Sequence, residues 1–127
     1  MHLVLCYKMV NYCLALPIVG GIDLVKKFAQ ENGGHTKEHD EFYRIAGISR
    51  EQIWIQRSPP GSGASDLEIV SIETNDPANT FKEFATSDHP WAIRFRDYAK
   101  KAFGIDITGP PPPPNENIAN WHEQTTT

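Results

Sequence analysis

The side chains with the clearest chemical potential are Trp54 and Gln56, two residues apart in the run EQIWIQ. Residues two apart on a strand point to the same face of a sheet, so one cavity could receive both side chains. A tryptophan wall beside an amide suits an aromatic or amphipathic organic ligand. The alternative, and the more frequent fate of a large aromatic side chain, is that Trp54 packs in the core or in a dimer interface.

A second group lies in the segment SDHPW, residues 87–91. His89 could act as a general base, with Asp88 orienting its ring. Adjacent side chains seldom point at each other, however, and the sequence offers no third partner. The favoured interpretation is that Asp88 caps the helix that begins near Pro90.

Trp91, Arg94 and Tyr98 follow one another at helical spacing, three and four residues apart. On one helix face, Arg94 could meet the carboxylate of a ligand that enters a cavity beside Trp91. The alternative is a solvated helix charge, which is the usual state of an arginine.

No stretch of the sequence predicts a metal or cofactor site. His35 and His39 stand four apart, but the text is HTKEH rather than HExxH, and a solvated helix face is the favoured interpretation. The turn PPGSG lacks the Lys-Ser/Thr of a phosphate-binding loop. Haem binding through His89 or His122 is a weaker hypothesis, so we expect neither cofactor nor metal.

Composition excludes several classes of protein. A chain of 127 residues is expected to form one domain, and its net charge of -4 argues against binding to nucleic acid. No run approaches the roughly 20 apolar residues of a membrane span. Two cysteines, Cys6 and Cys13, are too few for a disulfide framework, which favours a cytoplasmic protein with reduced thiols.

The chain divides into three expected parts. Residues 1–9 are an N-terminal extension that is either disordered or annotated from the wrong start codon, since Met9 offers a natural start. Residues 10–108 form the folded domain. Residues 109–127 form an arm that begins with five consecutive prolines, which favour an extended spacer, and a last short strand could form at residues 117–121.

The elements must position these residues, and their order predicts an α+β fold. Apolar alternation indicates strands at 12–18, 51–56 and 67–74, and helical periodicity indicates helices near 22–31, 36–46, 77–85 and 90–103. The first strand is apolar on both faces, which favours a central position. Strand–helix–strand–strand–helix is the split βαβ order, an antiparallel sheet with helices on one face.

The segments YCLALPI, WIQ, ETNDPANTFKEFATSDHPW and GIDITGPPPPP, in this order, resemble an uncharacterised bacterial family related to the dimeric α/β-barrel proteins. The resemblance covers most of residues 10–122. It implies a ferredoxin-like fold, a homodimer and a pocket between the sheet and the helices. The superfamily includes cofactor-free monooxygenases, haem-degrading enzymes and muconolactone-isomerase-like enzymes, but none of their catalytic motifs matches this chain residue by residue.

Two functions therefore stay open. In the first, the chain is a homodimeric protein that binds a small organic molecule or has a structural role, without turnover. The alternative is a cofactor-independent monooxygenase-like or isomerase-like enzyme that acts on an aromatic or polyketide-like substrate. The lack of a convincing acid–base set favours the first function, and the grouping of Trp54, Gln56, His89, Trp91 and Arg94 would favour the second.

Overall fold

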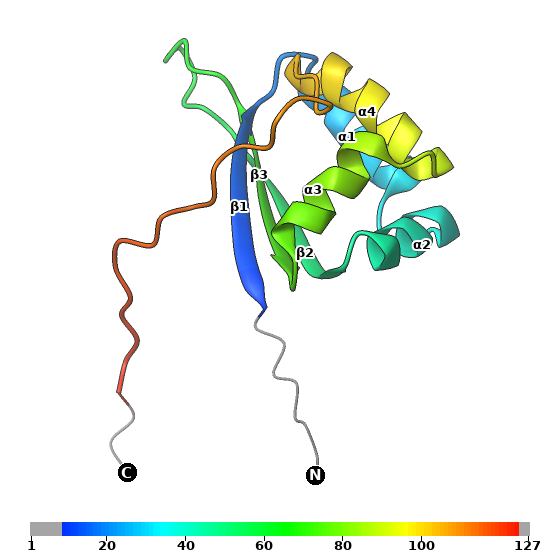
Figure 1. Ribbon diagram of the computed structural model, residues 1–127. Helices are drawn as coiled ribbons and strands as arrows, with labels where there is room; N and C mark the ends of the chain where they lie inside the picture. The colour runs from blue at the N-terminus through cyan, green and yellow to red at the C-terminus, as the bar shows by residue number, and fades with distance from the viewer. Residues whose placement is uncertain (1–8, 125–127) are drawn as a thin grey trace.

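The computed structural model describes residues 9–124 and has two layers, a sheet with all its helices on one face (Figure 1). The elements are β1 (Val10–Pro17), α1 (Ile22–Asn32), α2 (Lys37–Ile45), β2 (Ile48–Gln56), β3 (Leu67–Thr74), α3 (Pro77–Thr86) and α4 (Pro90–Phe103). This α+β order confirms the elements expected from periodicity. No helix in residues 9–124 is long and apolar enough to cross a membrane.

The sheet is antiparallel throughout and has the strand order β1-β3-β2. β3 is therefore the central strand, and the expectation that the first strand is central was wrong. Its outward residues Cys13 and Ala15 are exposed at the sheet edge. These outward side chains are small and apolar rather than charged, so the sequence of β1 resembles that of a strand buried on both faces although it lies at the edge.

Alternation along the strands separates the two faces of the sheet. On β3, Glu68, Val70, Ile72 and Thr74 are buried toward the helices, and the residues between them point outward. The register pairs Ile53 of β2 with Val70, so Ile53 belongs to the same inner face. Ile53 and Ile55 therefore share the inner face, and Trp54 and Gln56 share the outer face.

Side chains cap the starts of α3 and α4, whereas the starts of α1 and α2 have no side-chain cap. Asp76 caps α3 by accepting a hydrogen bond from the Asn79 amide, 3.1 Å away, and Gly104 ends α4 in the left-handed conformation that favours glycine. The cap of α4 is His89, so the expectation that Asp88 caps this helix was wrong.

The core lies mainly within the helical layer. One cluster joins α1 to the second half of α4 through Val25, Tyr98 and Phe103, and another joins α2, α3 and the start of α4 through Phe42, Phe84 and Trp91. The helices thus pack well on one another. The space between them and the inner face of the sheet is left open as a cavity.

The described part of the C-terminal arm, residues 109–124, runs past β1 and then away from the body of the molecule (Figure 1). The Tyr12 hydroxyl donates to the carbonyl oxygens of Pro112 and Pro113, 2.7 and 2.8 Å away. The short strand expected at 117–121 is absent, and those residues are extended and exposed. Prolines 110–114 carry no N–H, so this part of the arm cannot donate to the edge of β1.

Candidate functional site

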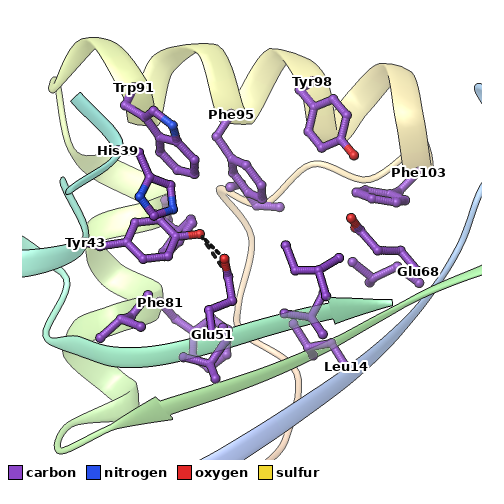
Figure 2. Close-up of a pocket in the computed structure, with 18 of the residues that line it drawn as sticks. Leu14, His39, Tyr43, Glu51, Glu68, Phe81, Trp91, Phe95, Tyr98 and Phe103 are labelled. Atoms are coloured by element: carbon purple, nitrogen blue, oxygen red, sulfur yellow. Dashed lines mark hydrogen bonds between the residues drawn. The ribbon is translucent and has the colours of Figure 1, made fainter. Parts of the chain in front are cut away.

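The candidate site is a cavity of about 1050 Å³ between the sheet and the helices (Figure 2). The sheet contributes the floor, and α4 contributes a roof of large aromatic rings. The C-terminal arm closes one side with Pro110–Pro112. This volume lies at the upper end of the roughly 300–1,000 Å³ that is typical of small-molecule sites.

Aromatic rings from α1, α2 and α4 line most of the cavity. Trp91, Phe95 and Tyr98 recur at helical spacing, so α4 presents them to the same side. Trp91 stacks on Phe95 at a centroid distance of 5.3 Å, and Phe28 of α1 stacks on Tyr98 at 4.0 Å. These contacts fix the ring orientations, so the apolar lining is preorganised.

A tyrosine–carboxylate pair lies on the floor of the cavity. The Tyr43 hydroxyl of α2 lies 2.8 Å from each carboxyl oxygen of Glu51, to which it donates (Figure 2). Burial raises the pKa of Glu51 to about 7, although the hydrogen bond from Tyr43 acts to lower it. Burial and the neighbouring Glu51 charge raise the pKa of Tyr43 well above its usual value, so the phenol keeps its proton.

Glu68 is the second carboxyl group of the floor. It stands on the central strand with only 7% of its surface exposed, and within residues 9–124 its carboxyl group forms no hydrogen bond. Burial and the charge of Glu51 raise its pKa to about 7. Figure 2 shows Glu68 below Tyr98, whose own pKa is raised by burial and by the charge of Glu68.

Neither glutamate was singled out from the sequence, although the signal was present. Glu68 is in phase with Val70 and Ile72 in LEIVSIET, and Glu51 is in phase with Ile53 and Ile55 in EQIWIQ. An acid that shares the parity of a buried apolar face is a candidate for a buried ionisable group. Alternation alone could therefore have predicted both residues.

Trp91 and Arg94 of α4 were expected to meet one ligand, and the structure separates them. Trp91 is buried, lines the cavity and donates its indole N–H to the backbone oxygen of Asn32, 2.7 Å away. Arg94 points away from the cavity. It donates to the side chain of Asn32, forms an ion pair with Glu38, and so links α4 to the end of α1 and the start of α2.

Trp54 and Gln56 lie on the outer face of the sheet, opposite the cavity. Trp54 is 49% exposed, and its cross-strand partner is Ile69. Within one chain, these two residues therefore cannot contact a molecule that also contacts Trp91.

His89 and Asp88 do not form a pair. The His89 ring accepts a hydrogen bond from the Trp91 amide at Nδ1, which caps α4, and its Nε2 lies 3.3 Å from Glu41. Asp88 is exposed. The cap fully explains the place of His89 in the fold.

The remaining histidines lie apart. His35 precedes α2 with a positive φ of 75°, whereas His39 lies within α2, where its ring stacks on Tyr43 and its Nδ1 lies 3.0 Å from Asp40. His122 lies in the exposed part of the arm. No group of three or more metal-ligating side chains that could hold an ion occurs within residues 9–124.

The site thus combines an apolar aromatic enclosure with two carboxyl groups that titrate near neutral pH. Such groups can accept a proton, donate one, or pair with a ligand's charge. Comparison of the chain with protein-family models, curated proteins and solved structures finds no match. The functional argument therefore depends on the geometry of the cavity.

Proposed function

We propose that this protein binds a small, largely apolar organic molecule in the cavity between the sheet and the helices. The observation that carries the proposal is the cavity itself: about 1050 Å³, lined by fixed aromatic rings and by two carboxyl groups, of which Glu68 is buried and Glu51 is half-buried. Small-molecule sites share this design, a mostly apolar hollow with a few convergent polar groups.

The test uses the native tryptophans. Among Trp54, Trp91 and Trp121, only Trp91 lines the cavity, so a Trp54→Phe/Trp121→Phe variant leaves a single reporter there. Titration with naphthalene derivatives is expected to quench or shift the Trp91 emission saturably. The matched control is Trp91→Phe, which keeps Trp54 and Trp121. The proposal fails if no probe alters Trp91 emission or if the control variant responds equally.

The second candidate function is a cofactor-independent enzyme that moves protons on an aromatic or polyketide-like substrate. The observation that favours it is the placement of Glu51 and Glu68, each with a pKa of about 7, on one cavity floor. An ionised Glu51 would take a proton from the carbon beside a carbonyl. The C–H electron pair would form the C=C bond of the enolate while the carbonyl π pair moves onto its oxygen, and the proton would return from Glu51 to the carbon or to the oxygen.

Deuterium exchange into an enolisable aromatic ketone such as 2-tetralone, followed by NMR in deuterated buffer, tests this activity. Wild-type protein is expected to accelerate exchange, and Glu51→Gln is expected to reduce the acceleration at least tenfold. Glu73→Gln on the outer part of β3 is the matched control. Exchange at the buffer rate with wild-type protein would exclude this function.

We also propose that the chain forms a homodimer through the outer face of its sheet, as the resemblance to ferredoxin-like, dimeric α/β-barrel proteins implies. Two observations support it. Trp54 is half exposed on that face, and the arm carries Ile118 and Trp121, which are 94% and 86% exposed. Apolar side chains that one chain leaves in water are typical of an interface, and a second copy would cover them.

Sedimentation velocity at micromolar concentration tests the dimer. Trp54→Glu is expected to shift the protein toward monomer because it places a charge in the proposed interface. Ile93→Glu is the control, because Ile93 is equally exposed but lies on α4, in the other layer. A wild-type protein that sediments as a monomer would overturn the dimer proposal.

A further inference from the structure

The two carboxyl groups of the cavity lack positive partners. The pKa of Glu51 responds to burial and to Tyr43, and that of Glu68 responds to burial and to Glu51. Arg44, Arg50 and Lys82 reach the cavity lining but are themselves exposed. A buried carboxylate is usually paired with a cation, so the missing partner is a feature to explain.

Glu68 differs from Glu51 in having no hydrogen-bond donor at all within residues 9–124. It is more than nine-tenths buried on the central strand, yet no hydrogen bond from the described part of the chain reaches its carboxyl group. Every fully buried side-chain oxygen or nitrogen among the described residues has a hydrogen-bond partner, so the unpartnered Glu68 oxygens are accessible. They are accessible from the cavity, which Glu68 lines. Glu51 keeps one donor, Tyr43, and points into the same space (Figure 2).

No cation within residues 9–124 acts on the pKa of either floor glutamate. Tyr43 and Tyr98 are neutral phenols whose raised pKa values keep them protonated. His39 stacks on Tyr43, and the polar partner of its Nδ1 is Asp40 rather than either glutamate. A ligand is the remaining source of a cation.

The roof is also suited to a cation. Trp91, Phe95 and Tyr98 line the cavity above the glutamates, and Phe28 and Phe103 extend this lining (Figure 2). The electron-rich faces of aromatic rings attract ammonium groups, most strongly where water is excluded. An aromatic roof over an acidic floor combines the two elements that recognise an organic ammonium ion.

We propose that the ligand of this cavity is an organic cation, an amine or quaternary ammonium compound with an apolar body, whose charged nitrogen lies between the floor glutamates Glu51 and Glu68 and the aromatic roof of α4. This inference rests on the proposed binding function and names its ligand class. A carboxylate ligand would be repelled by the floor. A neutral ligand would leave Glu68 unpaired.

The proposal has a defined pH dependence. A bound ammonium ion favours the ionised form of both glutamates. Below about pH 7 the glutamates of the free protein are largely protonated, so binding of the cation releases their protons. Affinity for the cation is therefore expected to rise with pH through this range. Affinity for a neutral ligand of the same shape is not expected to rise.

The test compares three probes that share one ring system: 1-naphthylmethylamine, 1-naphthylmethanol and 1-naphthoate. Binding to the full chain is measured by calorimetry at about pH 8 and about pH 6. At the higher pH the amine is expected to bind at least about tenfold more tightly than the alcohol. The naphthylmethyl-trimethylammonium ion, whose charge is fixed, separates titration of the protein from titration of the amine.

Variants locate the source of the preference. Glu68→Gln and Glu51→Gln keep the side-chain shape and are expected to reduce the amine preference about tenfold while leaving binding of the alcohol intact. Glu73→Gln, on the outer part of β3, is expected to behave as wild type. Thermal melts of each variant establish that it is folded.

The outcomes are distinguishable. If none of the three probes binds, the proposed binding function fails. If the alcohol binds as tightly as the amine, or if the amine preference survives in both glutamine variants, the cavity binds ligands but the assignment to organic cations is overturned. Tight binding of the amine that is lost in the glutamine variants supports both the binding function and the assignment to organic cations.

Discussion

At the scale of single residues, Glu68 shows how a fold can hold a carboxyl group where its ionised form is unfavourable without a positive partner. Strand alternation places its side chain among Val70 and Ile72, where only 7% of its surface is exposed. Its pKa therefore rises from 4.5 to about 7. Between these values, the folded chain retains a proton that the unfolded chain releases, so folding stability falls as the pH rises.

Glu68→Gln is accordingly expected to stabilise the ligand-free protein above pH 7. The raised pKa corresponds to roughly 2–3 kcal/mol of destabilisation at high pH, and the neutral amide avoids most of it. Urea unfolding at about pH 5 and about pH 8 measures the effect. The variant should match wild type at the lower pH and gain about 2 kcal/mol at the higher pH. An equal change at both values would contradict the argument.

At the scale of elements, the edge of β1 and the C-terminal arm depend on each other. The Asn115 side chain accepts a hydrogen bond from the Cys13 amide at 2.7 Å and donates to the Cys13 oxygen at 2.9 Å. One amide side chain thus takes the place of a neighbouring strand's peptide group. This contact protects an otherwise open edge and holds the prolines against the cavity.

Asn115→Ala is expected to loosen the arm. Loss of both bonds should speed hydrogen exchange at the Cys13 amide and expose the arm to proteases, with a stability cost of about 1–2 kcal/mol. Hydrogen-exchange mass spectrometry compares the variant with Asn117→Ala, whose side chain contacts only Asn120 in the exposed arm. Equal exchange in the two variants would show that Asn115 does not hold the arm.

At the scale of the whole molecule, the helical layer and the sheet are each well formed, but they enclose space rather than filling it. Ile53 points to the inner face of the sheet and is still 47% exposed, because it borders the cavity. Tightly packed interiors are the rule in domains of this size, so an open interior costs stability. A binding function for the cavity would explain why the open interior is retained despite its lower stability.

Ile53→Phe is expected to stabilise the fold while weakening ligand binding, because the larger side chain fills part of the cavity. Burial of the added apolar surface contributes about 1 kcal/mol, which corresponds to a rise of roughly 3–5 °C in Tm. Ile93→Phe makes the same change at a position 50% exposed on α4 and should leave both quantities unchanged. A lower Tm for Ile53→Phe would mean that the cavity cannot accept the ring.

Periodicity and cap residues determined the elements and their faces: the strand parity of Ile53 and Ile55, the start of α3 at Asp76-Pro77, and the end of α4 at Gly104. These features depend on local geometry, which a sequence records directly. Strand order depends on long-range pairing and is harder to predict from sequence, so β1 was wrongly expected at the centre of the sheet. The choice between two adjacent cap candidates was also missed, because Asp88 was expected to cap α4 and His89 does so.

Only the tertiary structure decided which chemically capable side chains meet. It moved Trp54 and Gln56 to the outer face, turned Arg94 toward Asn32 and Glu38, and brought Glu51 and Glu68 beneath the rings of α4. The sequence determined which face of a strand each glutamate occupies. The layer that covers that face, and the distance it keeps from the sheet, result from long-range packing, which gives a carboxyl group its partners and its pKa.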